Sequence, residues 1–105
     1  MKHAFLAFLL LLSATLTACG PVNTLRQGYQ QSQAVAADLE QSVGSKPLVG
    51  FNWHNGVLAS VTINFDGVPT QKPLFEIANL ARTAVKSHFK QEPQQIVLGF
   101  RLAPQ

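Results

Sequence analysis

The sequence predicts an α+β fold, a two-layer sandwich in which two helices cover one face of a three-stranded sheet, in the order helix-strand-strand-helix-strand. Two segments without proline carry apolar residues at helical spacing, and three segments alternate as strands do. The apolar faces of these segments are all buried if helices and strands form two layers. We assign this single small domain to residues 25–105 of the 105-residue chain.

The first helix is expected over Leu25 to Val43, and Gly44 is a typical stop just beyond a helix. Apolar or small residues recur every three or four positions and form a narrow stripe, while most other positions are polar. The stripe predicts a helix that packs one thin face on the domain. A free stalk or a coiled coil with a partner is the alternative. The stripe consists of Val22, Leu25, Tyr29, Ser32, Ala36, Leu39 and Val43.

Residues 46–66 are typical of a β-hairpin, because Asn-Gly at 55–56 is a strong turn signal between two alternating runs. A two-residue turn would place the aromatic residues of the first strand on the polar face of the second. We therefore expect a three-residue loop, 54–56, with a bulge, which pairs Trp53 with Val57 and gives the sheet one buried face. That face would hold Val49, Phe51, Trp53, Val57, Ala59, Val61, Ile63 and Phe65, and the other face Leu58, Ser60, Thr62, Asn64 and Asp66.

A second helix is expected from about Leu74 to Phe89, with Pro73 in its first turn. Its apolar face would hold Leu74, Ile77, Ala78, Ala81, Ala84, Val85 and Phe89. Residues 91–93, Gln-Glu-Pro, end this helix. The third strand follows, where Ile96, Leu98, Phe100 and Leu102 alternate with more polar or smaller residues.

The N-terminus has the pattern of a secretory signal. Lys2 and His3 precede an apolar run over residues 4–12, which is too short to span a bilayer, and small residues then lead to Cys19. Cys19 is the single cysteine of the chain, so it has no disulfide partner within it. Residues 1–18 are therefore predicted to be a signal peptide. An ordinary secretory signal followed by an isolated cysteine is the alternative.

Residues 16–19, Leu-Thr-Ala-Cys, resemble the lipobox of bacterial lipoproteins. The resemblance implies cleavage before Cys19, a diacylglycerol on its thiol and a fatty acid such as palmitate on its new amino group. Two or three acyl chains hold a protein firmly on a membrane. Gly20, where Asp would retain a lipoprotein in the inner membrane, implies an outer-membrane anchor facing the periplasm if the source is Gram-negative. Residues 19–24 would be the lipidated cysteine and a tether.

The second helix also carries the basic residues Arg82, Lys86 and Lys90 at a spacing of four, with Phe75 at the edge of this row. A solvated helix face is the simpler interpretation. Contact with anionic phospholipid headgroups or with a partner is the functional one, because each basic residue near an anionic surface contributes about 1 kcal/mol. The net charge of +3 is too small to indicate nucleic acid.

The order of elements over residues 25–102 also resembles the BON domain, a small envelope module. The matching residues are Asn55-Gly56-Val57 at the hairpin, and Ile77-Ala78 with Ala81-Arg82 in the following helix. Two features of that family's pattern are different or missing in this chain: the second strand runs longer before Gly67, and the last strand lacks the Gly-Val and Val-Asn run. The resemblance implies phospholipid binding.

Catalytic patterns are sparse in the sequence. There is no Ser-His-Asp signature and no glycine-rich phosphate loop. Beyond the predicted signal the histidines are His54, at the hairpin turn, and His88, on the second helix. A zinc site would require both to converge with Asp66 and Glu92, which their spacing does not favour.

We therefore expect no enzyme, cofactor or metal. The sequence predicts a membrane-anchored envelope lipoprotein whose domain binds a partner protein or an anionic phospholipid surface. An accessory subunit of an envelope secretion or assembly machine is the alternative; it would dock through a sheet edge or the polar sheet face. Trp53 is expected in the core, or exposed on a binding face if the register differs.

Overall fold

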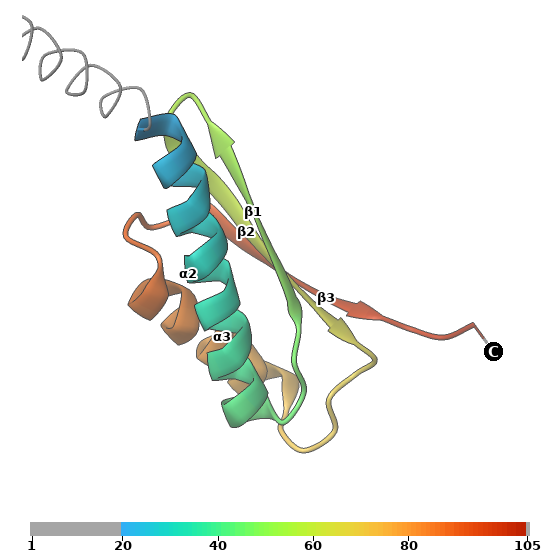
Figure 1. Cartoon of the computed structure of the whole chain (residues 1–105). Coiled ribbons are helices and arrows are strands. Elements are labelled where there is room, and N and C mark those ends of the chain that lie inside the picture. The colour runs from blue at the N-terminus through green and yellow to red at the C-terminus, as the bar shows by residue number, and fades with distance from the viewer. Residues whose placement is uncertain (1–19, 105) are drawn as a thin grey trace, which may run out of the picture.

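The computed structural model describes residues 20–104, and it confirms the predicted α+β fold class and element order (Figure 1). The predicted signal peptide and Cys19 lie outside the described residues. Two helices and three strands make up the domain: α2 (Gly20–Val43), β1 (Leu48–His54), β2 (Val57–Asp66), α3 (Leu74–His88) and β3 (Gln95–Arg101).

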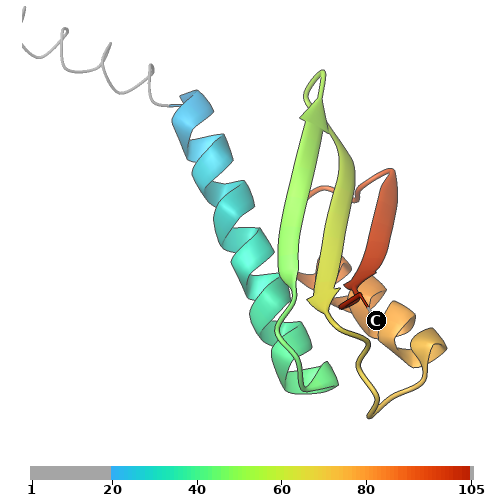
Figure 2. The ribbon, with the colours of Figure 1, turned by 90° about the vertical axis from the view of Figure 1, so that its right-hand side faces the viewer.

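The sheet has the order β1-β2-β3, with β2 in the centre. Strands β1 and β2 form an antiparallel hairpin, whereas β3 lies parallel to β2. A parallel neighbour requires a crossover connection, and α3 provides it. Both helices lie on the same side of the sheet (Figure 1, Figure 2). The other side of the sheet is not covered by any described element.

The core lies between the two layers and is centred on β2. The side chains of Val61, Ile63 and Phe65 are 0–1% exposed, because β2 has a strand on each side and helices above it. The core-facing residues of β1 and β3 are only half-buried, since two helices do not fully cover a three-stranded sheet. The remaining buried residues come from both helices and from the start of β2: Val35, Ala36, Leu39, Val43, Leu58, Ile77, Ala81, Ala84, Val85 and Phe89.

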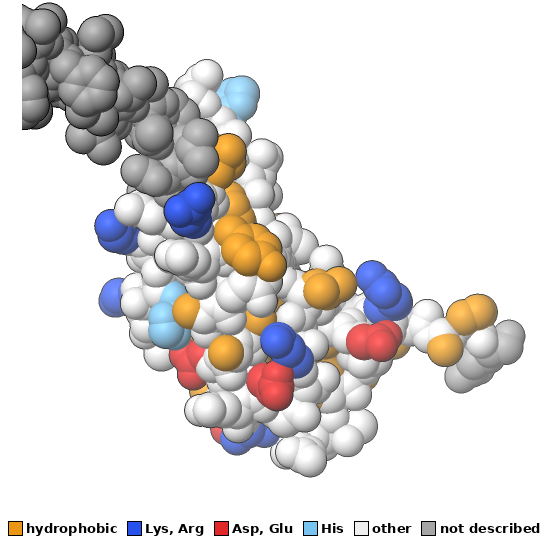
Figure 3. All heavy atoms as spheres, in the orientation of Figure 1, with side chains coloured by type: hydrophobic (Ala, Val, Ile, Leu, Met, Phe, Trp, Pro, Cys, Tyr) orange, Lys and Arg blue, Asp and Glu red, His pale blue; other side chains and the backbone are white. Residues whose placement is uncertain are grey.

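Helix α2 packs on the domain through a different face at its N-terminal end than the sequence predicts. The predicted stripe is correct from Ser32 to Val43, but Leu25 and Tyr29 are 64% and 62% exposed. Gly28 is buried instead, because only a residue without a side chain fits against the ring of Phe51. Hydrophobic side chains therefore remain on the surface near this end of α2 (Figure 3).

The helix also begins earlier than expected. It includes residues 20–24, which we expected to precede it as part of the tether. The side chain of Val22 lies outside the described part of the structure. Residues 28–43 of the helix pack on the domain, so this part of the chain is not a free stalk.

The predicted three-residue hairpin loop is wrong. His54 pairs with Val57 across a two-residue turn, in which Asn55 and Gly56 have φ angles of 53° and 75°. These positive angles are those of the turns that suit the twist of a hairpin. The bulge lies further along β2. Trp53 pairs with Leu58 and Asn52 pairs with Ser60, so Ala59 has no partner.

The bulge changes which residues of β2 face the helices. Leu58 is fully buried, whereas Val57, expected in the core, is 41% exposed and Ala59 is half-buried. Beyond the bulge, Val61 and Ile63 face the core as predicted and pair with Phe51 and Val49. The aromatic residues of β1 therefore lie on the core side as predicted, but the bulge at Ala59 places them there and not a three-residue loop.

The loop between α3 and β3 holds the bulge in place. The backbone N–H of Leu58 donates a hydrogen bond to the Oε1 atom of Gln91. The backbone N–H of Gln94 donates to the carbonyl oxygen of Leu58, at 3.1 Å. Both backbone polar groups of Leu58 are thus satisfied, which a buried bulge requires.

Helix α3 and strand β3 match the prediction except near their ends. Ile77, Ala81, Ala84, Val85 and Phe89 are buried as expected, with Phe89 just beyond the last helical residue. Two expected core positions are wrong. Leu74, at the first turn of α3, is 59% exposed, and Leu102, which follows β3 instead of belonging to it, is 67% exposed.

Candidate functional site

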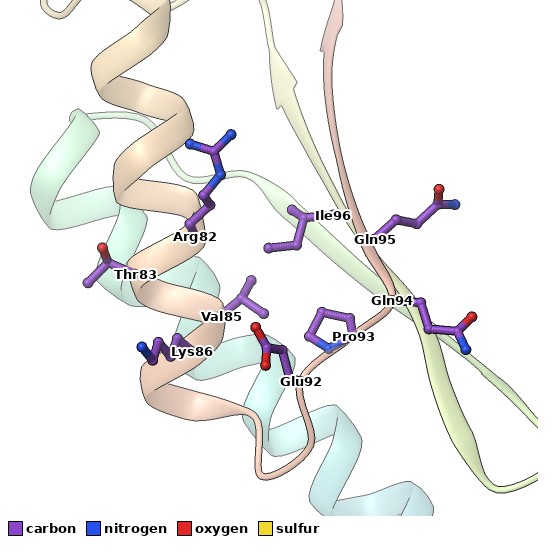
Figure 4. A pocket seen from close by; sticks show the side chains of 9 residues that line it. All are labelled: Arg82, Thr83, Val85, Lys86, Glu92, Pro93, Gln94, Gln95 and Ile96. Carbon is purple, nitrogen blue, oxygen red and sulfur yellow. The ribbon is translucent and has the colours of Figure 1, made fainter.

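A groove of about 580 Å³ lies between the second half of α3 and the beginning of β3 (Figure 4). Its floor is apolar, because Val85 of α3 and Ile96 of β3 point toward one another and Pro93 lies beside them (Figure 4). Charged and polar groups surround this floor. The other lining residues are Arg82, Thr83, Lys86, Glu92, Gln94 and Gln95.

The groove exists because β3 is an edge strand. On the central strand the core-facing residues are almost fully buried, but Ile96, Leu98 and Phe100 of β3 remain half-buried under the same helix layer. Among residues 20–104, no strand pairs with the outer edge of β3. The edge lacks the usual protection, since residues 96–100 include neither a charge nor a proline.

The geometry of the groove therefore suits an extended polypeptide. A strand added to the edge of β3 would hydrogen-bond with its backbone and place alternate side chains over Ile96 and Val85. Arg82 and Lys86 border the α3 side and Glu92 the loop side, so the two cations exceed the one acid. This balance favours a segment that has an acidic residue beside an apolar one.

The structure separates the four residues predicted as a binding row. Arg82 and Lys86 line the groove, and the Nη1 atom of Arg82 donates a hydrogen bond to the Oδ1 atom of Asn79 at 2.8 Å. Lys90 does not continue the helical row, because α3 ends at His88 and the backbone at Phe89 is extended. Phe75 is 75% exposed at the start of α3.

Lys90 instead lines a second hollow, of about 290 Å³, beside the N-terminal half of α2. Trp53 contributes to this hollow while it packs partly on the core, and its Nε1 atom is buried without a hydrogen-bond partner. Trp53 is thus on the core side, as predicted, and not exposed on a binding face. The other lining residues are Gln27, Gly28, Gln31 and Gln91.

The histidines and acids that a metal site would need lie apart. The Nε2 atom of His88 is 3.3 Å from the Oδ2 atom of Asp38, which links α3 to α2 at a partly exposed position. His54 is exposed at the hairpin turn. Within the described part of the chain, no three histidine, cysteine or acidic residues are grouped as metal ligands.

Sequence reasoning found the α3 side of the groove and missed the rest. The spacing of four reveals Arg82 and Lys86 as a row, but the sequence pattern indicates only a helix end for Glu92 and Pro93 and a core position for Ile96. The missing signal was the position of the last strand in the sheet. No pattern within the last strand marks it as an edge, because residues 96–100 lack the charges and prolines that edge strands usually carry.

Comparisons with protein-family models, curated proteins and solved structures found no match to this chain. The resemblances to bacterial lipoproteins and to the BON domain therefore stay predictions. In residues 20–104, neither helix has the length and apolar character needed to cross a bilayer.

Proposed function

We propose that this chain is a non-enzymatic envelope lipoprotein, anchored by lipid on Cys19, whose domain docks a partner protein. The docking role depends on one observation, the apolar groove beside the uncovered edge of β3. The proposed cellular location depends on the lipobox-like residues 16–19. In a Gram-negative cell, this location is the periplasmic side of the outer membrane. An accessory subunit of a secretion or assembly machine is the alternative, and it would use the same groove.

The groove and the edge support a protein partner because they combine two kinds of recognition. The edge of β3 offers backbone donors and acceptors, which give affinity for any extended segment. The pair Val85 and Ile96 selects an apolar side chain, and Arg82 with Lys86 selects an acidic one. The anchor would keep this site at the membrane surface, where partners in the envelope are concentrated.

A phospholipid surface, the other partner expected for the basic row, fits this groove less well. Headgroups present a broad plane, whereas Arg82 and Lys86 border a hollow that also contains Glu92. Lys90 lines a different hollow, and Phe75 belongs to the first turn of α3, at the far end of that helix. We therefore assign the groove to protein and not to lipid.

Site-specific photo-crosslinking in cells tests the docking role. A photoreactive residue at Glu92, which is exposed and points into the groove between Val85 and Pro93 (Figure 4), is expected to capture one dominant envelope protein. The same residue at Asn64, on the uncovered sheet face, is the matched control. Charge reversal in Arg82→Glu/Lys86→Glu should reduce the crosslink, while Lys46→Glu should leave it unchanged. Equal capture from Asn64, or no effect of the charge reversal, would contradict the proposal.

A further inference from the structure

The beginning of α2 carries two large side chains that the domain does not bury. Leu25 and Tyr29 are 64% and 62% exposed, and their spacing of four places them on one helix face. The exposed Arg26 is adjacent to Leu25. This face is not needed for docking the helix, because Gly28 makes the contact with Phe51. Exposed apolar side chains grouped on one surface indicate an interaction site.

The tip of the β-hairpin and the end of α3 lie at the same end of the domain. Figures 1 and 2 both place the hairpin tip at the end where α2 begins. Val57, the first residue after the turn, is 41% exposed. Lys90 lies on the other side of α2, where it lines the same hollow as Gln27 and Gly28. Five exposed residues therefore surround this end of the domain, and we call them the α2-end surface: Leu25, Arg26, Tyr29, Val57 and Lys90.

Four of the five acids belong to segments away from the α2-end surface, and the fifth, Glu92, is two residues after Lys90. Two of the five residues of the α2-end surface are cations, Arg26 and Lys90, and none is an acid. In the view of Figure 3, acidic side chains lie toward the opposite end, while Lys and Arg also occupy the end near α2's start. The five acids are in the second half of α2, at the end of β2, in the first turn of α3 and on the groove: Asp38, Glu40, Asp66, Glu76 and Glu92.

We infer that the α2-end surface contacts the headgroup layer of an anionic phospholipid bilayer, an inference that rests on the proposed anchor at Cys19. Helix α2 includes Gly20, the residue that follows the proposed lipidated cysteine. A rise of about 1.5 Å per residue puts Leu25 only about 7.5 Å along the helix from Gly20. Tyrosine is enriched at the membrane–water interface, and basic residues there are attracted to anionic headgroups.

This orientation gives the exposed residues of α2 a partner. The acyl chains would bring the first turns of α2 to the headgroups, so the α2-end surface needs to add little affinity of its own. Its effect is to fix how the domain sits on the membrane. Phe75, at the start of α3, would then stay in water, in contrast to the contact that the sequence predicted for it.

Environment-sensitive labels on the acylated chain test this orientation. Because acylation blocks the thiol of Cys19, a new cysteine is the one site that reacts with an NBD maleimide. Gln30→Cys, at an exposed position one helical turn after Arg26, and Val57→Cys report on the α2-end surface, and Phe75→Cys is the control. In vesicles of phosphatidylcholine and phosphatidylglycerol, we expect NBD emission at Gln30 and Val57 to shift to shorter wavelength and to be quenched by brominated lipid, with no change at Phe75.

Variants and lipid composition make the test specific. Leu25→Ser/Tyr29→Ser should reverse the shift while the circular dichroism spectrum is unchanged, because both side chains are exposed. Vesicles of phosphatidylcholine alone should give a smaller shift. Insertion of the Phe75 label in place of the other two would overturn the inference. So would a shift at Gln30 in the unacylated Cys19→Ser chain that occurs without vesicles and rises with protein concentration, which would show a second copy on this surface.

A mass spectrum of each labelled sample separates the two proposals. If Cys19 carries no acyl chains, the proposed anchor itself is wrong. If Cys19 is acylated and the chain floats with the vesicles, but the labels at Gln30 and Val57 remain in water, the anchor stands and only the inferred contact is wrong.

Discussion

Replacing Gly28 with alanine tests whether the first half of α2 is docked on β1. In a free helix, Gly→Ala stabilises by about 1 kcal/mol, because alanine is the better helix former. In this structure, a Cβ atom at Gly28 would lie 2.7 Å from the Cε2 and Cζ atoms of Phe51. The two predictions have opposite signs, so even a modest change in stability distinguishes them.

The magnitude follows from the contact distance. Carbon atoms pack best at about 3.5–4.0 Å, so the ring of Phe51 must move by about 1 Å. The ring is not free to do so, since it packs edge-on against Phe89 with centroids 6.2 Å apart. Overpacking of this kind costs about 1–3 kcal/mol. After the gain in helix propensity, we expect a net loss of about 1 kcal/mol, or about 4–8 °C in Tm for a domain of this size.

The assay is urea unfolding followed by circular dichroism, on chains that begin at residue 19 with Cys19→Ser. A second background, Phe51→Leu, removes the ring. There Gly28→Ala should stabilise by about 1 kcal/mol, which gives a coupling of about 2 kcal/mol between the two positions. Stabilisation by Gly28→Ala in both backgrounds would refute the docking of this part of α2.

Three further changes test the core, the bulge and the groove. Leu39→Ala, at a fully buried position, should lower the unfolding free energy by about 2–5 kcal/mol in the same urea assay. Gln91→Ala should cost about 1–3 kcal/mol because it leaves the Leu58 N–H without its acceptor, whereas Gln91→Glu keeps an acceptor oxygen and should stay close to wild type. Arg82→Glu/Lys86→Glu should unfold at the wild-type urea concentration while the crosslink from the groove is lost; a large fall in stability would contradict a role limited to binding.

The hairpin shows how far the sequence could be interpreted. The Asn-Gly turn and the aromatic residues on the core side are both correct predictions. A two-residue turn without a bulge cannot satisfy both, which is why the sequence predicts a longer loop. The structure reconciles them with a bulge at Ala59. Nothing in the local sequence marks Ala59 as a bulge, because the group that stabilises it, Gln91, comes from a distant part of the chain.

The packing of the first helix and the position of the groove also depend on contacts between residues that are distant in the sequence. Tyr29 looks like a better core residue than Gly28, and hydrophobicity alone chooses the wrong one. The choice depends on the ring of Phe51, which leaves room for no side chain on α2. The row of Arg82 and Lys86 was visible from spacing, but whether it bordered a groove depended on which strand lay at the edge of the sheet. Packing between elements decides both questions, and helical or strand periodicity does not report it.

The mass of the N-terminal peptide tests the central claim most directly. Trypsin cleaves after Arg26, so a mature lipoprotein extracted from bacterial membranes should yield the peptide 19–26. We predict that this peptide begins at Cys19 and carries a diacylglyceryl group on the thiol and a fatty acid on the amino group. A peptide that extends upstream of Cys19, or one with an unmodified Cys19 thiol, would contradict the account.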